Sequence, residues 1–160
     1  MCKMRVGFGY DVHRLKSGRR FVLCGVEIPC DFGPDGHSDA DVAVHALMDA
    51  MLGAMALGDI GKLFPDSDST YLNANSTVLL KKVYNLVTQE GYCLGNADIT
   101  IVLQSPRIAS YIDKMRSTIA DILSVEISDV SVKATTEEYL GFTGDKTGVC
   151  AYAVVLLKRI

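Results

Sequence analysis

All three histidines of the chain lie between positions 13 and 45, in a segment that is dense in aspartate. Asp11 stands two residues before His13, and Asp41 and Asp49 stand four residues on either side of His45. Imidazoles and carboxylates are the ligands of catalytic zinc sites, which use three protein ligands and keep a fourth position open for substrate or water. The residue types of this segment therefore predict a metal site.

The spacing indicates which of these side chains could converge. Asp11 and His13 occupy alternate positions of a predicted strand over residues 4–13, so their side chains point to the same face. His45 lies on a predicted helix, and a helix packed on that strand would bring its ring to the same volume. We therefore predict Asp11, His13 and His45 as the metal ligands. The alternative is an exposed Asp-x-His pair on an edge strand, because two-residue patterns often arise by chance.

His37 and Asp49 are further candidates near these ligands. His37 precedes Ser38 at the start of the helix, so it is either a ligand or a side chain that lies over an anion bound there. Asp49 follows His45 by one helical turn, which predicts that it orients the ring, unless it simply faces solvent. The motifs of dinucleotide-binding loops, Walker loops, zinc proteases and serine hydrolases are missing from the sequence.

Hydrophobic periodicity and capping residues predict the elements that must position these side chains. The sequence predicts strands at residues 4–13, 21–28, 97–103, 130–135 and 149–157, and helices at about 41–57, 76–90 and 108–123. Ser38, Asp39 or Asp41 would cap the first helix, and Ser76 the second. This order predicts an α+β sandwich with a mixed or antiparallel sheet and helices on one face. Because several strands are apolar on both sides, we expect another subunit to cover the free face.

Length and composition exclude several classes of protein. A chain of 160 residues that is 49% hydrophobic and 22% charged predicts one globular domain over residues 1–160. The net charge of −3 argues against nucleic acid as a partner. The apolar runs are too short or too interrupted to span a membrane. With no leader-like segment at its start, the chain is expected to be cytoplasmic, or an organellar form whose leader has been removed.

Four separated blocks of the sequence resemble the 2-C-methyl-D-erythritol 2,4-cyclodiphosphate synthase family. They are GYDVH at residues 9–13, HSDADVAVH at 37–45, LGDIGKLFPD at 57–66, and KATT at 133–136 together with LGFTG at 140–144. The match runs in order from residue 4 to residue 160. Several blocks in one register are more specific than any single motif.

The resemblance implies a homotrimer of ferredoxin-like subunits around a threefold axis, with active sites at the subunit interfaces. It implies that 4-diphosphocytidyl-2-C-methyl-D-erythritol 2-phosphate is converted to the 2,4-cyclodiphosphate and CMP by intramolecular phosphoryl transfer in the non-mevalonate route to isoprenoids. Asp11, His13 and His45 would hold Zn²⁺, and Glu138 would hold a second divalent ion, Mg²⁺ or Mn²⁺.

The resemblance also implies roles for other residues. His37 and Thr136 would be the catalytic residues at the phosphates. The substrate would be bound by Ser38, Asp59, Ile60, Gly61, Phe64, Asp66 and Phe142. Cytidine would be held from the neighbouring subunit by Gln104, Ser105, Pro106, Arg107, Ile108, Ala109, Ala134, Thr135 and Thr136. Lys62, Arg107 and Lys133 would add positive charge near the phosphates, unless they are ordinary surface charges.

The sequence departs from the family pattern at two places. Asp145 and Lys146 replace an arginine that lines an anion-binding cavity in many members, which weakens the case for an anion there. Ala40 replaces a frequent glycine, a change that the first turn of a helix tolerates.

Two other functions stay open besides the cyclodiphosphate synthase. They are a zinc-dependent phosphohydrolase and a non-catalytic trimeric module that binds nucleotides.

Overall fold

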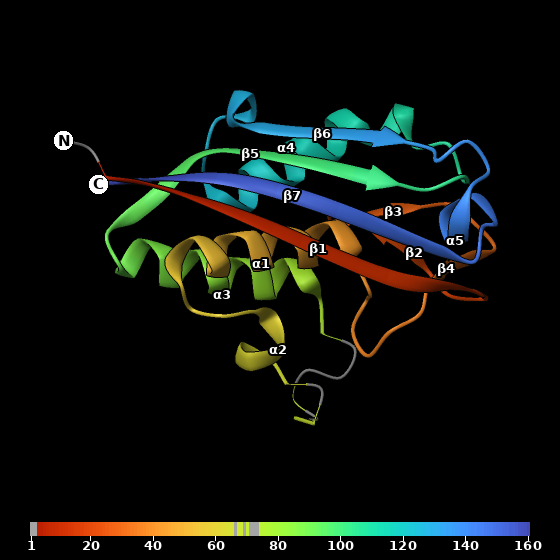
Figure 1. Cartoon of the computed structure of the whole chain (residues 1–160), viewed down its shortest axis with the longest axis horizontal. Coiled ribbons are helices and arrows are strands. Elements are labelled where there is room, and N and C mark those ends of the chain that lie inside the picture. Colours follow the sequence, from red (N-terminus) through yellow and green to blue (C-terminus); the bar gives the residue numbers. More distant parts are fainter. Residues whose placement is uncertain (1–2, 66, 69, 71–73) are drawn as a thin grey trace.

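The computed structural model describes residues 3–65, 67–68, 70 and 74–160, which form a mixed sheet packed against helices (Figure 1). The sheet has five strands in the order β4-β1-β7-β5-β6. Their bounds are β1 (Met4–Ser17), β4 (Phe32–Pro34), β5 (Tyr92–Val102), β6 (Val130–Thr135) and β7 (Gly148–Arg159). Only β5 and β6 pair in parallel, and β2 (Phe21–Leu23) and β3 (Val26–Ile28) form a separate hairpin. The predicted α+β class and mixed sheet are therefore confirmed.

Three longer helices supply the apolar layer against this sheet. They are α1 (Val42–Met55), α3 (Ser76–Gln89) and α4 (Ile112–Leu123). Helix α1 packs on β1 and β7, α4 packs on β6, and α3 lies beside α1 (Figure 1). The short elements are α2 (Ile60–Leu63), α5 (Gly141–Gly144), and the 3-10 turns η2 (Ala109–Tyr111) and η3 (Ile127–Asp129). Among the described residues, no helix has both the length and the apolar character required to cross a membrane.

Two glycines allow α1 to lie directly on the backbone of β1. A Cβ atom added at Gly7 would stand 1.8 Å from the backbone oxygen of Ala50, and one at Gly9 would stand 1.9 Å from that of Ala46. No side chain fits in such a space, so the strand must carry glycine here. Asp11 and His13 follow on the same face of β1, which brings them close to α1.

The opposite face of β1 carries a row of apolar side chains that a single chain leaves exposed. Val6 and Phe8 are 69% and 62% exposed, and Tyr10 and Val12 continue the row. Tyr152 on β7 packs its ring against those of Phe8 and Tyr10. The alternation predicted for this strand is confirmed, and the side that packs on α1 is the one with glycine, aspartate and histidine.

Several element boundaries differ from the prediction. Strand β5 begins at residue 92 rather than 97, because Gly95 forms an irregularity that lets the pairing continue past it. Helix α4 begins at residue 112 rather than 108, after the turn η2. Strand β4 and helices α2 and α5 lie in segments predicted as loops.

The helix caps also differ in part. Asp41 caps α1 by accepting a hydrogen bond from Val44 N, which selects one of the three predicted residues. The cap of α3 is Asn75, so the prediction of Ser76 was wrong by one residue. Ala40 has a φ of 54°, in the left-handed region, and is not in a helical turn. Glycine adopts this conformation freely, whereas alanine does so at a cost of about 1–2 kcal/mol.

Candidate metal centre

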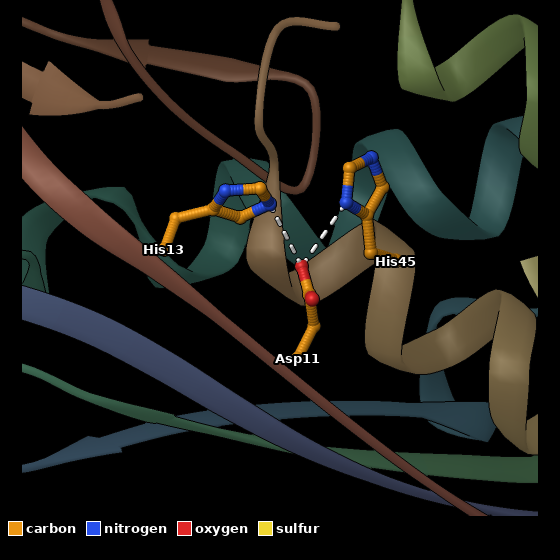
Figure 2. A group of neighbouring side chains, drawn as sticks. All are labelled: Asp11, His13 and His45. Carbon is orange, nitrogen blue, oxygen red and sulfur yellow. Dashed lines mark hydrogen bonds and ion pairs between the residues drawn. The ribbon is translucent and has the colours of Figure 1, made fainter. Parts of the chain in front are cut away.

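Asp11, His13 and His45 meet at the junction of β1 and α1 (Figure 2). Oδ2 of Asp11 lies 3.1 Å from Nε2 of His13 and 3.0 Å from Nδ1 of His45. One ligand atom from each residue lies within 4.8 Å of the others. The convergence predicted from the spacing is therefore present, and the close packing of α1 on Gly7 and Gly9 makes it possible.

The ring of His13 is oriented by a backbone carbonyl. Its Nδ1 donates a hydrogen bond to the carbonyl oxygen of Asp35 at 2.8 Å. A carbonyl oxygen can only accept, so Nδ1 carries the proton and Nε2 keeps its lone pair. This Nε2 is buried, and its contact with Asp11 lacks hydrogen-bond geometry, so it has no hydrogen-bond partner among the described residues. A lone pair turned toward a carboxylate fits a shared cation.

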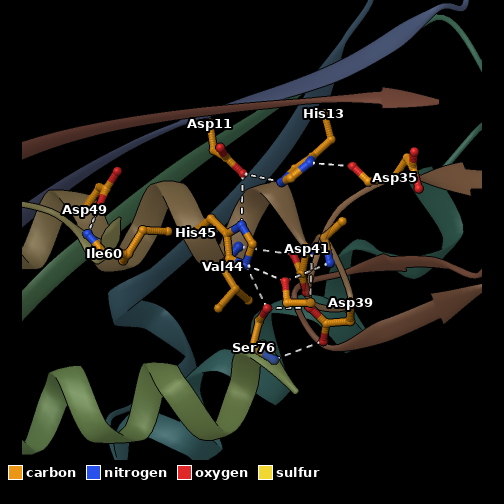
Figure 3. Close-up of polar contacts among 12 residues, drawn as sticks. Asp11, His13, Asp35, Asp39, Asp41, Val44, His45, Asp49, Ile60 and Ser76 are labelled. Atoms are coloured by element: carbon orange, nitrogen blue, oxygen red, sulfur yellow. Dashed lines mark hydrogen bonds and ion pairs between the residues drawn. The ribbon is translucent and has the colours of Figure 1, made fainter. Parts of the chain in front are cut away.

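The ring of His45 is held by hydroxyl groups on its other side. Its Nε2 lies 2.9 Å from Oγ of Ser76 and 3.3 Å from Oγ of Ser38. The backbone N and the hydroxyl group of Ser76 also donate hydrogen bonds to the carboxylate of Asp39 (Figure 3). Both imidazoles thus have one nitrogen toward Asp11 and the other engaged by the protein, which is the arrangement of metal-binding histidines.

Contacts among the three side chains shift the pKa values of Asp11 and His13. Burial raises the pKa of Asp11, but the imidazoles of His13 and His45 more than offset this, and the net shift is downward. Burial lowers the pKa of His13, but Asp11 and the carbonyl of Asp35 raise it by more. Asp11 is therefore ionised at neutral pH, as a metal ligand must be.

A pocket of about 460 Å³ opens onto the three side chains. Its lining consists of Asp11, His13, Asp35, Gly36, His37, Ser38, His45, Met48, Ile60, Gly61, Phe64 and Leu79. The structure thus brings five residues predicted for the phosphates and substrate to the metal ligands: His37, Ser38, Ile60, Gly61 and Phe64.

Two of the remaining residues predicted for the substrate, Asp59 and Phe142, do not line this pocket. Asp59 is exposed and caps α2, accepting a hydrogen bond from Lys62 N at 3.0 Å. Phe142 lies in α5 and is not part of the pocket lining. Asp66 lies outside the described residues.

Asp49 has a different contact from the one predicted. Its Oδ1 accepts a hydrogen bond from the backbone N of Ile60 at 2.8 Å (Figure 3). Burial raises its pKa, and the neighbouring carboxylates of Asp59 and Asp11 add to the shift. Asp49 therefore joins the start of α2 to α1. Among the described residues, the hydroxyl groups of Ser76 and Ser38 are the groups in contact with Nε2 of His45.

A second pocket, of about 320 Å³, lies at the ends of β5 and β6. Its lining consists of Leu103, Gln104, Pro106, Arg107, Ile108, Ala109, Ile112, Ala134, Thr135 and Thr136. These include all the residues predicted for cytidine except Ser105, which lies in the same turn. No residue lines both pockets.

Thr136 lines this second pocket rather than the pocket at the three ligands, and Glu138 is hydrogen-bonded to it. Oγ1 of Thr136 donates to Oε1 of Glu138 at 3.2 Å, and both residues are exposed. Within one chain, the predicted catalytic residues His37 and Thr136 therefore line different pockets. Lys133 forms an ion pair with Asp98, so its charge is engaged there.

Sequence reasoning missed the groups behind the two imidazoles. Asp35 contributes a backbone carbonyl, which no side-chain pattern announces. Ser76 and Asp39 are polar residues at predicted helix starts, and this pattern indicates only a capping role for them.

Comparisons with known proteins identify the family. The model of the YgbB family matches residues 4–158. This chain belongs to the YgbB family. A 2-C-methyl-D-erythritol 2,4-cyclodiphosphate synthase of Clostridioides difficile is 56% identical over 154 residues, which cover 96% of either chain. The resemblance inferred from the four sequence blocks is therefore confirmed.

Solved structures of YgbB-like chains have the same fold. The bifunctional IspDF of Campylobacter jejuni matches with a TM-score of 0.96 and 43% identity, over 100% of this chain and 43% of that one. This chain thus spans less than half the length of that bifunctional protein. An IspF of Plasmodium falciparum, solved as a CDP complex, matches with a TM-score of 0.87 and 33% identity, over 98% and 96% of the two chains.

Proposed function

We propose that this chain converts 4-diphosphocytidyl-2-C-methyl-D-erythritol 2-phosphate to 2-C-methyl-D-erythritol 2,4-cyclodiphosphate and CMP, as a phosphorus–oxygen lyase of the non-mevalonate pathway. An oxygen of the 2-phosphate forms a bond to the β-phosphorus, and the bond from that phosphorus to the CMP oxygen breaks. The observation that carries this proposal is the meeting of Asp11, His13 and His45 on the wall of a pocket that α2 also lines. The identity with named synthases supports it.

The three side chains fit a zinc ion. Asp11 offers an ionised carboxylate, and His13 Nε2 and His45 Nδ1 face it. A zinc ion held by these three ligands would keep a further coordination position for a phosphate oxygen. We assign a second ion, Mg²⁺ or Mn²⁺, to Glu138. Bound divalent ions neutralise phosphate charge and the charge that develops on the departing CMP.

The protein's own contribution is to hold both ends of a flexible substrate. The attacking group is already an anionic phosphate, so the reaction needs no strong general base. His37 and Ser38 contact the phosphates from one side and Thr136 from the other, while Asp59, Asp66 and the pocket residues of α2 hold the methylerythritol. Fixing both ends converts an improbable ring closure into a near-attack geometry.

We further propose a homotrimer of ferredoxin-like subunits around a threefold axis. The exposed apolar row on β1 needs a cover, since Val6 and Phe8 together with Tyr152 form a continuous patch. The pocket at the three metal ligands and the pocket at the ends of β5 and β6 share no residue within one chain. This supports a complete site formed by two subunits. The parallel β5–α4–β6 unit supports the ferredoxin-like assignment.

Product analysis tests the proposed function. The purified chain is incubated with the cytidine diphosphate substrate and divalent ions, and the products are followed by ³¹P NMR. We expect CMP and the cyclic diphosphate in equal amounts, and no turnover after chelation or in His45→Ala. Glu90→Ala, a change of an exposed residue at the end of α3, serves as the matched control with normal turnover. An acyclic product would instead support the phosphohydrolase, and nucleotide binding without turnover would support the binding module.

A further inference from the structure

A buried chain of hydrogen bonds runs from His45 into the start of α3. Oγ of Ser76 lies 2.9 Å from Nε2 of His45 and also donates to Oδ1 of Asp39 (Figure 3). The other oxygen of Asp39 accepts a hydrogen bond from the backbone N of Ser76 at 3.0 Å. His45 is only 7% exposed and Ser76 is fully buried, so water does not compete for these groups.

The chemistry of His45, Ser76 and Asp39 determines which group donates in each of these hydrogen bonds. Ser76 donates its single hydroxyl proton to Asp39, so its oxygen is available to His45 only as an acceptor. Ser76 therefore favours a proton on Nε2 of His45. Without a cation, the carboxylate of Asp11 competes for this proton, because it lies in hydrogen-bond contact with Nδ1 at 3.0 Å. A zinc ion held by Asp11 and Nδ1 would end the competition, and zinc-bound His45 would then donate its Nε2 proton to Ser76.

Ser38 is a second group, besides Asp11, that could reverse this direction. Its Oγ lies 3.3 Å from Nε2 of His45 and accepts a hydrogen bond from Ala40 N at 3.1 Å, which leaves its own proton free to donate. If Ser38 donated to Nε2, the proton of the neutral ring would move to Nδ1 and block the nitrogen that faces Asp11. The shorter contact with Ser76, fixed by the charge of Asp39, opposes that arrangement.

We propose that Ser76 and Asp39 are positioning residues that provide the acceptor for the Nε2–H group of zinc-bound His45, and thereby raise the affinity of the site for zinc. This inference rests on the metal site assigned under the proposed function. Asp39 acts on the ring only through Ser76, and it also joins the start of α3 to the loop before α1, because its N donates to the carbonyl oxygen of Ala74.

Two substitutions separate the hydroxyl from the carboxylate. Ser76→Ala removes the acceptor for Nε2. Asp39→Asn keeps the shape but introduces an amide NH₂. Because the backbone N of Ser76 still needs an acceptor, the amide oxygen turns toward it and the NH₂ donates to Ser76 Oγ, which frees the hydroxyl proton for Nε2.

The controls address folding and the start of α3. Asn75→Ala removes the cap of α3, which accepts a hydrogen bond from Thr77 N, without touching His45. Ser76→Thr keeps the hydroxyl group and tests rescue. The secondary structure of every variant is checked by circular dichroism before its metal binding is measured.

The readout does not depend on turnover. The zinc affinity of the metal-free protein is measured by competition with a chromophoric chelator. We expect zinc affinity about 10–100-fold lower in Ser76→Ala and a similar loss in Asp39→Asn. Asn75→Ala and Ser76→Thr should bind zinc like the wild type.

Different failures have different meanings. Wild-type zinc affinity in both Ser76→Ala and Asp39→Asn would overturn the inference and leave the proposed metal site standing. An equal loss of affinity in Asn75→Ala would also overturn it, because the effect would then come from the fold of α3. A wild-type chain that binds no zinc would overturn the metal site and this inference together.

Discussion

His13 and His45 are held from behind by acceptors of different kinds, a backbone carbonyl for one and a serine hydroxyl for the other. Each acceptor leaves the opposite ring nitrogen directed at Asp11. At the level of single residues, the site therefore directs two ring nitrogens and a carboxylate at one point, which fits a shared cation.

His37 lines the same pocket without belonging to this set, and it faces solvent. We predict that His37→Ala retains one zinc per chain and lowers kcat by about 100-fold, the usual effect of removing one group that stabilises a transition state. Metal analysis and steady-state kinetics on the same preparation check this. Loss of zinc together with activity would mean that His37 is a ligand, and an unchanged kcat would remove its catalytic role.

Asp41 provides a test of pH dependence. Burial raises its pKa from the ordinary 3.8 to about 6, although it accepts hydrogen bonds from the backbone N of Cys24, Gly25 and Val44. Between about pH 4 and pH 6 the folded protein keeps a proton that the unfolded chain has lost, so this group lowers stability as the pH rises through that window.

We predict that the free energy of unfolding of the wild type, minus that of Asp41→Asn, falls by about 3 kcal/mol from pH 3 to pH 7 and is constant above. Asp41→Asn is itself destabilised at every pH, because its NH₂ group faces backbone N–H donors. The change of the stability difference with pH is therefore the quantity that tests the assignment. Urea unfolding at one protein concentration and several pH values measures it. A difference that is flat or rises with pH would contradict the assignment.

Among the elements, the contact between α1 and β1 determines the geometry of the site. We predict that Gly9→Ala destabilises the fold by at least the 1–3 kcal/mol typical of an overpacked core, because its Cβ would stand 1.9 Å from the backbone oxygen of Ala46. The displaced helix should also carry His45 away from Asp11 and weaken zinc binding.

Gly53→Ala is the matched control on the same helix. Gly53 is exposed, and the nearest heavy atom to its added Cβ would be the backbone oxygen of Phe8 at 3.9 Å. This change should stabilise α1 by about 0.5–1 kcal/mol through helix propensity. Thermal unfolding and zinc titration of both variants check the pair. Equal stabilities for the two variants would contradict the close approach of α1 to β1.

Periodicity predicted the helices and the central strands because burial repeats along them, as it does in α1 and β7. It missed the start of β5, where Gly95 interrupts the alternation. For the site, alternate positions on β1 predicted Asp11 and His13, and the helix added His45. The contact of Ser76 with His45 could not be predicted, because it depends on how α3 lies against α1 and not on any local pattern.

At the scale of the whole molecule, the exposed apolar row and the metal ligands lie on opposite faces of the same strand, β1. We predict that Phe8→Glu converts a trimer to monomers, because it places a charge in the apolar patch. Turnover should be lost while zinc binding stays, since the ligands face α1. Light scattering and metal analysis measure the two effects.

Val78→Glu is the control for this change, because Val78 is also an exposed apolar residue, 55% exposed, but lies on α3. It should remain a trimer with normal turnover. A monomeric wild type that is fully active would contradict the proposal that the site is completed by a neighbouring subunit.

The most direct test of the account is anomalous diffraction at the zinc absorption edge from crystals of the chain grown with zinc. The account predicts one peak per chain, at about 2.0–2.2 Å from a carboxylate oxygen of Asp11, Nε2 of His13 and Nδ1 of His45. A map without a peak between these three side chains, or with zinc bound only elsewhere, would contradict it.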